Sequence, residues 1–305
     1  KMIVYNAEPL DFSEKAIKSW EKKGYIYYAG SWDEIDNALC FTNVEVLIIR
    51  LSRKIDSSIL KKFPDLKTLV SATTGLDHID LNELNIRGIT LLSLKKHNDF
   101  LNTIPSTAEH TWALLMSLAR MIPAADLHVS KGFWQRDLFK GHQLKDKTIG
   151  IIGLGRTGRR VAHYAEAFDM VIYFYDPYVT DDKYRRITEL EELLSISDFI
   201  TIHVHLNHST RHLINERNIE AIKKGAYLIN TSRGEVLDDK AVTRALIDGK
   251  LGGIAVDVLA KELDHIQEDT LWQLKSKCQN IIITPHIGGA TLEAMKLCEE
   301  YLASL

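Results

Sequence analysis

The sequence is poor in several residue types whose abundance would mark a particular class of protein. Only 3 of its 305 residues are cysteine, and Cys40, Cys278 and Cys298 lie too far apart for a zinc motif or a redox pair. Scattered thiols are typical of a reducing compartment rather than of a disulfide framework. The 6 prolines and 17 glycines form no flexible or polyproline linker. We therefore expect a cytoplasmic protein without a metal site, whose domains are joined by ordinary structured chain.

An excess of one charge and long apolar runs are also missing. The 38 Lys and Arg residues balance 41 Asp and Glu residues, which gives a formal net charge of −3. Such a chain has no basic excess with which to neutralise a nucleic-acid backbone or an anionic membrane. The first ten residues lack the apolar core of a signal peptide, and apolar runs such as 44–49 are too short to span a bilayer. Neither nucleic acid nor membrane is expected as a partner.

The sequence does contain an alternation of strand-like and helix-like segments, with 45% hydrophobic residues to build cores. Five apolar runs in the first hundred residues are predicted to be buried strands: 3–5, 25–29, 44–50, 66–72 and 89–94. Six more follow later: 148–153, 170–176, 198–205, 226–232, 251–258 and 280–286. Because helical patterns separate these runs, we predict two doubly wound α/β domains with parallel sheets.

A long helix is predicted between the two sets of strands, over residues 106–121. Ser106 and Glu109 form a capping-box pattern, and Pro105 stands just before it. Apolar residues cover most of the circumference of this helix, so we expect it to be buried between domains or against a second copy of the chain. The last segment, 290–305, is also predicted to be helical.

The run GLGRTG at 153–158 fits the glycine fingerprint of dinucleotide-binding domains, G-x-G-x-x-G. The pattern alone is weak, but here a predicted strand precedes it and a predicted helix follows. Gly153 would permit the tight turn, Gly155 the close approach of a pyrophosphate, and Gly158 the close packing of helix on strand. The helix N-terminus then offers unpaired N–H groups to the phosphates.

Polar residues near the glycine run support the same interpretation. Arg156 and Thr157 lie in the first turn of the helix, where both side chains can reach phosphate oxygens. Asp176 ends the next predicted strand, close to the expected spacing of about 20 residues. A carboxylate there accepts hydrogen bonds from ribose hydroxyls and repels a 2′-phosphate, so we predict NAD rather than NADP. The alternative is a structural turn with a surface aspartate.

Three further motifs follow later predicted strands, at the edge where ligands bind in open α/β sheets. NTSRG places Arg233 after the strand 226–232, and VDVLAKE places Asp257 and Glu262 at and beyond the end of the next one. TPHIGGAT places His286 after the last strand. A guanidinium, carboxylates and an imidazole are therefore expected to converge on one edge of the sheet.

In these motifs and their order, the chain resembles the D-isomer-specific 2-hydroxyacid dehydrogenase family, which includes D-lactate, glyoxylate/hydroxypyruvate and 3-phosphoglycerate dehydrogenases. The resemblance covers nearly the whole chain. With the motif order, it implies a Rossmann NAD-binding domain at 104–284, inserted in a discontinuous, flavodoxin-like substrate domain of residues 1–103 and 285–305. It also implies an NAD-dependent enzyme that interconverts a D-2-hydroxy acid and its 2-oxo acid.

The resemblance implies Arg233, Glu262 and His286 as catalytic residues, and the chemistry of these side chains agrees. Histidine, with an ordinary pKa near ~6.5, suits exchange of the hydroxyl proton. Glu262 would hold the other ring nitrogen and favour the protonated imidazole, and Arg233 would bind the substrate carboxylate and polarise the carbonyl. Leu263 follows Glu262 where the family commonly has Pro, a departure that bears on the position of this loop.

The resemblance also implies contacts beyond the catalytic residues. Further cofactor contacts are implied at His203, Thr231, Ser232, Asp257 and Gly288. Substrate contacts are implied at Thr74 and Gly75 in the run TTGLDHID. Arg50 and Arg53, at and after the end of the strand 44–50, could bind a distal anionic group such as phosphate, although solvated surface charges are an equally good interpretation.

Some positions depart from the family pattern. His205 and Asn207 replace Pro and Thr beside the adenine site, and the segment 95–105 replaces a shorter glycine-containing lead into the long helix. Asp169 replaces a Gly before the second strand of the NAD-binding domain, and Asp tolerates the left-handed conformation.

The resemblance further implies a homodimer formed through residues 106–145. An NAD(H)-sensing binding protein of the corepressor type, built on the same scaffold, is the alternative to an enzyme. Formate dehydrogenases pair the catalytic His with Gln, whereas this chain has Glu262. The sequence does not identify the acid or tell whether it is phosphorylated.

Overall fold

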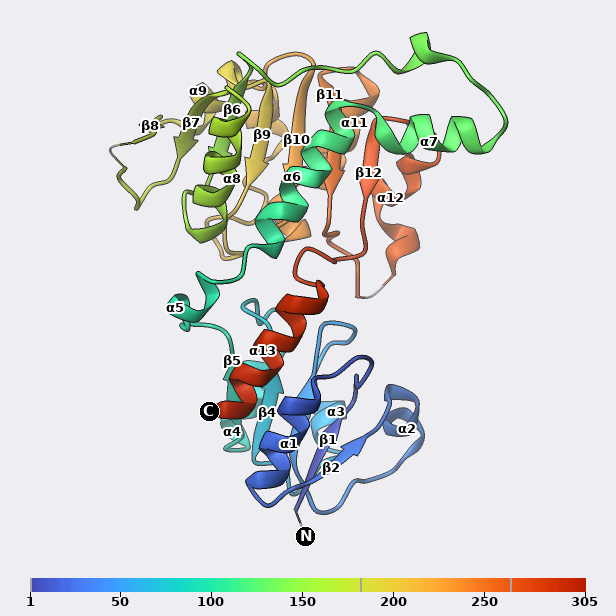
Figure 1. Cartoon of the computed structure of the whole chain (residues 1–305), viewed down its shortest axis with the longest axis vertical. Coiled ribbons are helices and arrows are strands. Elements are labelled where there is room, and N and C mark those ends of the chain that lie inside the picture. Colours follow the sequence, from blue (N-terminus) through green and yellow to red (C-terminus); the bar gives the residue numbers. More distant parts are fainter. Residues whose placement is uncertain (1, 182, 264) are drawn as a thin grey trace. The chain divides into compact units, whose positions relative to one another are not determined.

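The computed structural model describes residues 2–181, 183–263 and 265–305, so that Lys1, the first residue of the predicted substrate domain, lies outside it. The chain divides into two compact units, Lys1–Ile104 with Ala290–Leu305, and Pro105–Gly289 (Figure 1). The predicted boundaries followed residues 103 and 284, and the observed ones follow Ile104 and Gly289. The first unit is therefore discontinuous in sequence, and the second is a single insertion.

The first unit is built around a five-stranded parallel sheet. Its strands, in spatial order, are β2 (Ile26–Ala29), β1 (Ile3–Asn6), β3 (Val44–Ile49), β4 (Thr68–Ser71) and β5 (Thr90–Ser93). The order 2-1-3-4-5 is that of flavodoxin-like sheets, as predicted. Its helices are α1 (Glu14–Lys22), α2 (Trp32–Asn37), α3 (Ser57–Leu60), α4 (Leu81–Ile86), α5 (Asn98–Leu101) and the C-terminal α13 (Leu292–Ser304).

Alternate residues of β1 and β3 enter two different cores, which explains why these strands are nearly continuous apolar runs. Tyr5 and Leu47 pack with Leu60 of α3 on one face of the sheet. Val4 and Val46 pack on the other face with residues of α1 and α13. Burial on both faces is the usual condition of a parallel sheet covered by helices.

The second unit has a seven-stranded sheet in which every pair of neighbours is parallel. Its strands, in spatial order, are β12 (Ile281–Ile283), β11 (Leu251–Val256), β10 (Ala226–Asn230), β9 (Phe199–Ile202), β6 (Thr148–Ile152), β7 (Val171–Tyr175) and β8 (Arg185–Arg186). Numbered within the unit, this order is 7-6-5-4-1-2-3, which contains the Rossmann order. The sequence predicted six of these strands and missed β8, because two arginines give no apolar run.

Helices cover both faces of this second sheet (Figure 1). The helices of this unit are α6 (Ser106–Ala119), α7 (Ile122–Ser130), α8 (Arg156–Ala167), α9 (Leu190–Ile196), α10 (Glu216–Ile219), α11 (Asp239–Ile247) and α12 (Thr270–Lys275), of which α7 buries no residue. Short 3-10 segments, η1, η2 and η3, occupy Arg136–Phe139, Gly234–Val236 and Ile266–Glu268. In the part of the chain that the structure describes, no helix is long and apolar enough to cross a bilayer.

Helix α6 corrects one sequence prediction, the capping box. Pro105 is the N-cap, and no side chain of the described residues caps this helix end. Ser106 is instead the first helical residue, and its buried hydroxyl has no hydrogen-bond partner among the described residues. The helix begins one residue too early for Ser106 to stand outside it and reach back to the free amides. Its apolar side packs on β10, β11 and α8 of its own unit.

Asp169, between α8 and β7, confirms the expectation of a left-handed residue. Its φ is 54°, a conformation that Asp adopts more readily than most residues. Its amide donates to the carbonyl of Glu166 (3.0 Å), and its own carbonyl accepts from the amide of Asp146 (3.0 Å). This residue therefore ends the helix and turns the chain into the next strand.

A carboxyl group at the start of α11 makes the stability of the second unit depend on pH. Burial, followed by the charge of Asp269, raises the pKa of Asp239 to about 7. Asp238 and Glu235 raise it further, and Lys261 opposes them. Because the folded pKa lies above the unfolded value near ~3.9, the native state retains a proton that the unfolded chain releases. Stability is therefore lost as pH rises from about 4 to 7.

We expect Asp239→Asn to remove this loss. The variant should be more stable than the parent at pH 8, by about 1–2 kcal/mol since the group is partly screened, and little changed at pH 4. Thermal unfolding across this range measures the effect. The control is Asp248→Asn at the other end of α11, because Asp248 is not among the charges that raise the pKa of Asp239. Parallel pH profiles for the two variants would contradict the assignment.

Candidate active site

The glycine run forms the turn between β6 and α8, as predicted. Gly153 has a φ of 89°, and a Cβ there would lie 2.6 Å from the carbonyl oxygen of His203. A Cβ on Gly158 would lie 2.1 Å from the carbonyl oxygen of Gly153, so this glycine lets the helix approach the strand. A Cβ on Gly155, the N-cap of α8, would meet no atom within 4 Å. Two glycines are therefore structural, and the third leaves open space.

The N-terminus of α8 opens onto that space. Arg156 and Thr157 are its first two residues, and the first hydrogen bond of the helix runs from the amide of Arg159 to the carbonyl of Gly155 (2.9 Å). The amides before Arg159 have no acceptor within the helix, and the helix dipole makes this end positive. Open space and a positive helix end together fit the pyrophosphate of a dinucleotide.

Asp176, directly after β7, is buried beside the glycine run. One carboxylate oxygen accepts from the amide of Leu154, in the turn between Gly153 and Gly155 (3.0 Å). The other accepts from the amides of Tyr178 (2.9 Å) and Val179 (3.0 Å). The carboxylate is therefore held in one orientation next to the glycine run.

His286 and Glu262, two of the three predicted catalytic residues, form a hydrogen-bonded pair. His286 Nδ1 lies 2.6 Å from Glu262 Oε1, and Glu262 Oε2 accepts from the amide of Leu259 (3.1 Å). Leu263 thus does not keep Glu262 from its partner. Because Nδ1 is committed to the carboxylate, Nε2 is the ring nitrogen able to exchange a proton with a ligand.

Arg233, the third predicted catalytic residue, follows β10. Its Nη1 donates to the carbonyl of Ser232 (2.7 Å), and its own carbonyl accepts from the side-chain amide of Asn230 (2.9 Å). Beside it, a Cβ on Gly234 would lie 2.1 Å from the carbonyl carbon of Leu259. The segment that carries Arg233 therefore packs directly on the backbone of the loop that carries Glu262.

Asp257, predicted as a cofactor contact, is 2% exposed and lies at the centre of a hydrogen-bond cluster. Its carboxylate accepts from four groups: the amides of Ile287 (2.9 Å) and Gly288 (2.7 Å), Thr284 Oγ1 (2.5 Å) and His110 Nε2 (3.1 Å). Burial raises its pKa, but these hydrogen bonds outweigh burial and hold the pKa below its ordinary value. Asp257 is thus ionised and anchors the loop of His286.

The remaining predicted cofactor residues lie at the ends of β9 and β10. Thr231 Oγ1 is 2.7 Å from Thr111 Oγ1, and Ser232 Oγ donates to Asn230 Oδ1 (2.7 Å). Burial lowers the pKa of His203 to about 3, so its imidazole is neutral. A cofactor contact for each of these residues stays a prediction.

Two departures from the family pattern form local structure of their own. The carbonyl of His205 accepts from Thr210 Oγ1 (2.6 Å), and Asn207 Oδ1 accepts from the amides of Ser209 (2.8 Å) and Thr210 (3.1 Å). In the first unit, His97 of the segment 95–105 lies 2.8 Å from the hydroxyl of Tyr301, in α13.

The predicted substrate contacts Thr74, Gly75 and Arg50 all belong to the first unit. Thr74 and Gly75 follow β4, where Thr73 Oγ1 donates to the carbonyl of Gly75 (2.9 Å). Their contact with a substrate stays a prediction.

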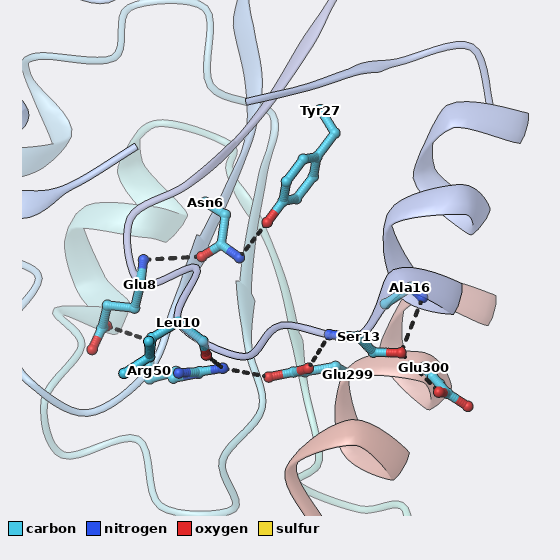
Figure 2. Close-up of polar contacts among 9 residues, drawn as sticks. All are labelled: Asn6, Glu8, Leu10, Ser13, Ala16, Tyr27, Arg50, Glu299 and Glu300. Carbon is cyan, nitrogen blue, oxygen red and sulfur yellow. Dashed lines mark hydrogen bonds and ion pairs between the residues drawn. The ribbon is translucent and has the colours of Figure 1, made fainter. Parts of the chain in front are cut away.

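Arg50, just after β3, is held by acidic residues rather than left in solvent. Its Nη2 donates to Glu299 Oε1 (2.8 Å) and to the carbonyl of Leu10 (2.8 Å), and its amide donates to Glu8 Oε2 (2.6 Å) (Figure 2). Arg53 likewise pairs with Asp36 at 2.7 Å. An anionic ligand would compete with these carboxylates for either guanidinium, and their proposed role in phosphate binding stays a prediction.

His110 is a residue of this hydrogen-bond cluster that was not predicted from the sequence. It has no motif of its own, and only the docking of α6 across the strand ends brings it to Asp257 and Thr284. The available signal was its spacing from Thr107 and Thr111, three and one residues away, which places the three polar side chains on one side of the helix.

Comparison with known proteins places this geometry in a family. Residues 112–288 match the family described as D-isomer specific 2-hydroxyacid dehydrogenase, NAD binding domain. The chain is 35% identical over 300 residues to a D-3-phosphoglycerate dehydrogenase of Archaeoglobus fulgidus, an alignment that covers 96% of this chain and 54% of the relative. It is 35% identical over 256 residues to a hydroxypyruvate reductase of Thermotoga maritima, with 83% and 80% covered.

The chain thus spans about half the length of the phosphoglycerate dehydrogenases it matches. Among solved structures, a D-lactate dehydrogenase from Aquifex aeolicus complexed with NAD and lactic acid has a TM-score of 0.79 and 30% identity, over 99% of this chain and 93% of that one. A protein of Thermus thermophilus gives 0.83 and 28%, over 99% and 94%. The chain belongs to the D-isomer-specific 2-hydroxyacid dehydrogenase family, and residues 112–288 are its NAD-binding domain.

Proposed function

We propose that the protein is an NAD-dependent oxidoreductase that interconverts a D-2-hydroxy acid and its 2-oxo acid. The observation that carries this proposal is the pair of His286 Nδ1 and Glu262 Oε1, 2.6 Å apart, on the sheet edge that also carries the glycine loop. A histidine oriented by a carboxylate suits a reaction in which one proton must be exchanged at an alcohol oxygen. The relatives named for reduction or oxidation of such acids support the same class.

The proposed mechanism assigns one task to each residue of the site. When bound, NAD supplies the hydride chemistry at C2 of the substrate. In the direction of reduction, His286 Nε2 donates a proton to the carbonyl oxygen, and Glu262 stabilises the charged imidazole and fixes its orientation. Arg233 binds the substrate carboxylate and stabilises negative charge on the carbonyl oxygen. Thr74 and Gly75 are proposed as further substrate contacts.

The preference for NAD over NADP is proposed from Asp176. Its carboxylate is fixed beside Leu154 of the glycine run, where it can accept from ribose hydroxyls and would repel a 2′-phosphate. Gly155 leaves the room that a pyrophosphate requires.

The test is oxidation of NADH and NADPH by the purified protein with a panel of 2-oxo acids that includes glyoxylate, pyruvate, hydroxypyruvate, and phosphorylated and sugar-derived acids. We expect turnover with at least one acid and a preference for NADH that weakens in Asp176→Ala. Tight NADH binding without turnover of any acid would favour the NAD(H)-sensing protein instead. An unchanged cofactor preference in the variant would contradict the role of Asp176.

We further propose that the protein forms a homodimer in a reducing cytoplasm. The three cysteines take part in no disulfide within the described chain. Large apolar side chains are exposed on α7 and the segment after it: Ile122 (50%), Leu127 (55%), Val129 (48%), Phe133 (54%), Trp134 (86%) and Leu138 (60%). Contiguous exposed apolar groups of this kind mark an interaction surface. The family resemblance implies that residues 106–145 contact a second copy of the chain.

A further inference from the structure

Helix α6 carries three polar side chains on one side, and two of them, His110 and Thr111, reach three neighbouring strand ends. Thr107, His110 and Thr111 have the spacing i, i+3, i+4, which places them together on the helix surface. Thr111 Oγ1 is 2.7 Å from Thr231 Oγ1, just after β10. His110 Nε2 is 3.1 Å from Asp257 Oδ1, just after β11, and 3.0 Å from Thr284 Oγ1, just after β12. The same three strand ends lead into Arg233, Glu262 and His286.

The backbone of His286 needs an external constraint. Its φ is 55°, in the left-handed region that non-glycine residues seldom adopt. Asp257 supplies the constraint, because the amide of His286 donates to the carbonyl of Asp257 (2.8 Å). The next two amides, of Ile287 and Gly288, donate to its carboxylate. The orientation of the His286 loop therefore depends on the orientation of Asp257.

The hydrogen atoms of this cluster can be assigned from its donors and acceptors. Thr284 Oγ1 donates its single proton to Asp257 Oδ1, at 2.5 Å. The hydroxyl can then only accept from His110, and the carboxylate of Asp257 is also an acceptor. Nε2 of His110 must therefore carry a proton, which it shares between the two oxygens.

We propose that His110 is a positioning residue for His286, acting through Asp257 and Thr284. The expected effect on kcat rests on the proposed function, whereas the effect on the position of His286 does not. The shared proton on Nε2 holds the Asp257 carboxylate and the Thr284 hydroxyl in place. The Asp257 carboxylate in turn holds the left-handed backbone at His286, so that the imidazole stays within hydrogen-bond distance of Glu262. His110 is thus assigned no contact with the reacting atoms.

Kinetics with His110→Phe and His110→Gln test the proposal. Phe fills the site without a donor, whereas the Gln side-chain amide can donate at the place of Nε2. We expect His110→Phe to lower kcat by about 10- to 100-fold, the effect of losing a hydrogen bond to a charged group, with little change in the dissociation constant of NADH. His110→Gln should recover most of kcat. The control is His163→Phe, on the exposed side of α8, which should behave as the parent.

A spectroscopic measurement separates failure of this inference from failure of the proposed function. With 15N-labelled histidine, the Nδ1 proton of His286 shared with Glu262 should give a downfield signal in the parent and in His110→Gln. That signal should broaden or shift in His110→Phe. Thr284→Val, which leaves His110 in place, should shift it as well and serves as the second variant if His110→Phe unfolds. An unchanged His286 signal in both variants would overturn the inference, whether or not any 2-oxo acid is turned over.

Discussion

Replacement of His286 by alanine is expected to lower kcat by about 10²- to 10⁴-fold, the range for loss of a general acid or base. The reason is the geometry of the pair, in which Glu262 takes Nδ1 at 2.6 Å and leaves Nε2 as the group that exchanges the substrate proton. The dissociation constant of NADH should change little, because the glycine run and Asp176 lie at the other end of the proposed cofactor site. Steady-state kinetics and NADH fluorescence titration measure the two quantities.

The matched control for this variant is His212→Ala. His212 also has a left-handed backbone, with a φ of 52°, so its replacement by alanine perturbs the chain in the same way. It lies in the segment between β9 and α10, and its amide donates to the carbonyl of Glu235 (2.8 Å). We expect parental kcat from His212→Ala. The contrary result would be weaker NADH binding by His286→Ala with a parental kcat at saturating NADH. His286 would then have a structural rather than a chemical role.

The sequence was informative wherever a residue's task is local. The run 44–50 could be predicted as a buried parallel strand because helices cover both faces of such a sheet. Its residues then show little alternation between polar and apolar types. Gly153 was predictable because its left-handed φ belongs to the turn itself, and Gly158 because the carbonyl that its Cβ would meet, that of Gly153, lies in the same turn. That His286 and Glu262 lie at one edge of the sheet was predictable from motif order, since parallel strands end at the same edge. Their pairing was predicted from the family resemblance.

The sequence was uninformative where two distant segments decide the outcome. His110 reaches Asp257 only because α6 crosses three strand ends, and no local pattern fixes that crossing. Arg50 is neutralised by Glu299, far along the chain in the C-terminal helix, and a sequence motif at Arg50 carries no trace of this. The capping box at Ser106 failed for a different reason, because the helix started one residue earlier and took the serine inside.

The second large effect is expected in the glycine run, where two glycines differ in what surrounds them. Gly158→Ala would place a Cβ 2.1 Å from the carbonyl oxygen of Gly153, and a backbone atom cannot swing aside. Alanine favours a helix over glycine by only about 1 kcal/mol. Overpacking against a rigid neighbour costs about 1–3 kcal/mol and sometimes more, so the clash should win. We expect a lower Tm, with weaker NADH binding as a consequence of the displaced helix.

Gly155→Ala is the matched substitution three residues earlier. Its φ of −79° suits any residue, and its Cβ would meet no protein atom within 4 Å. Tm should therefore fall only by the cost of alanine in place of glycine at a helix N-cap, about 0.5–1 kcal/mol or ~1–4 °C. The added methyl would occupy the space proposed for the pyrophosphate, and the dissociation constant of NADH should rise about 10-fold or more. Thermal unfolding without cofactor and NADH titration together separate the two roles. Parental NADH affinity in Gly155→Ala would show that the pyrophosphate does not approach this glycine, whereas a parental Tm in Gly158→Ala would show that α8 can yield to the added methyl.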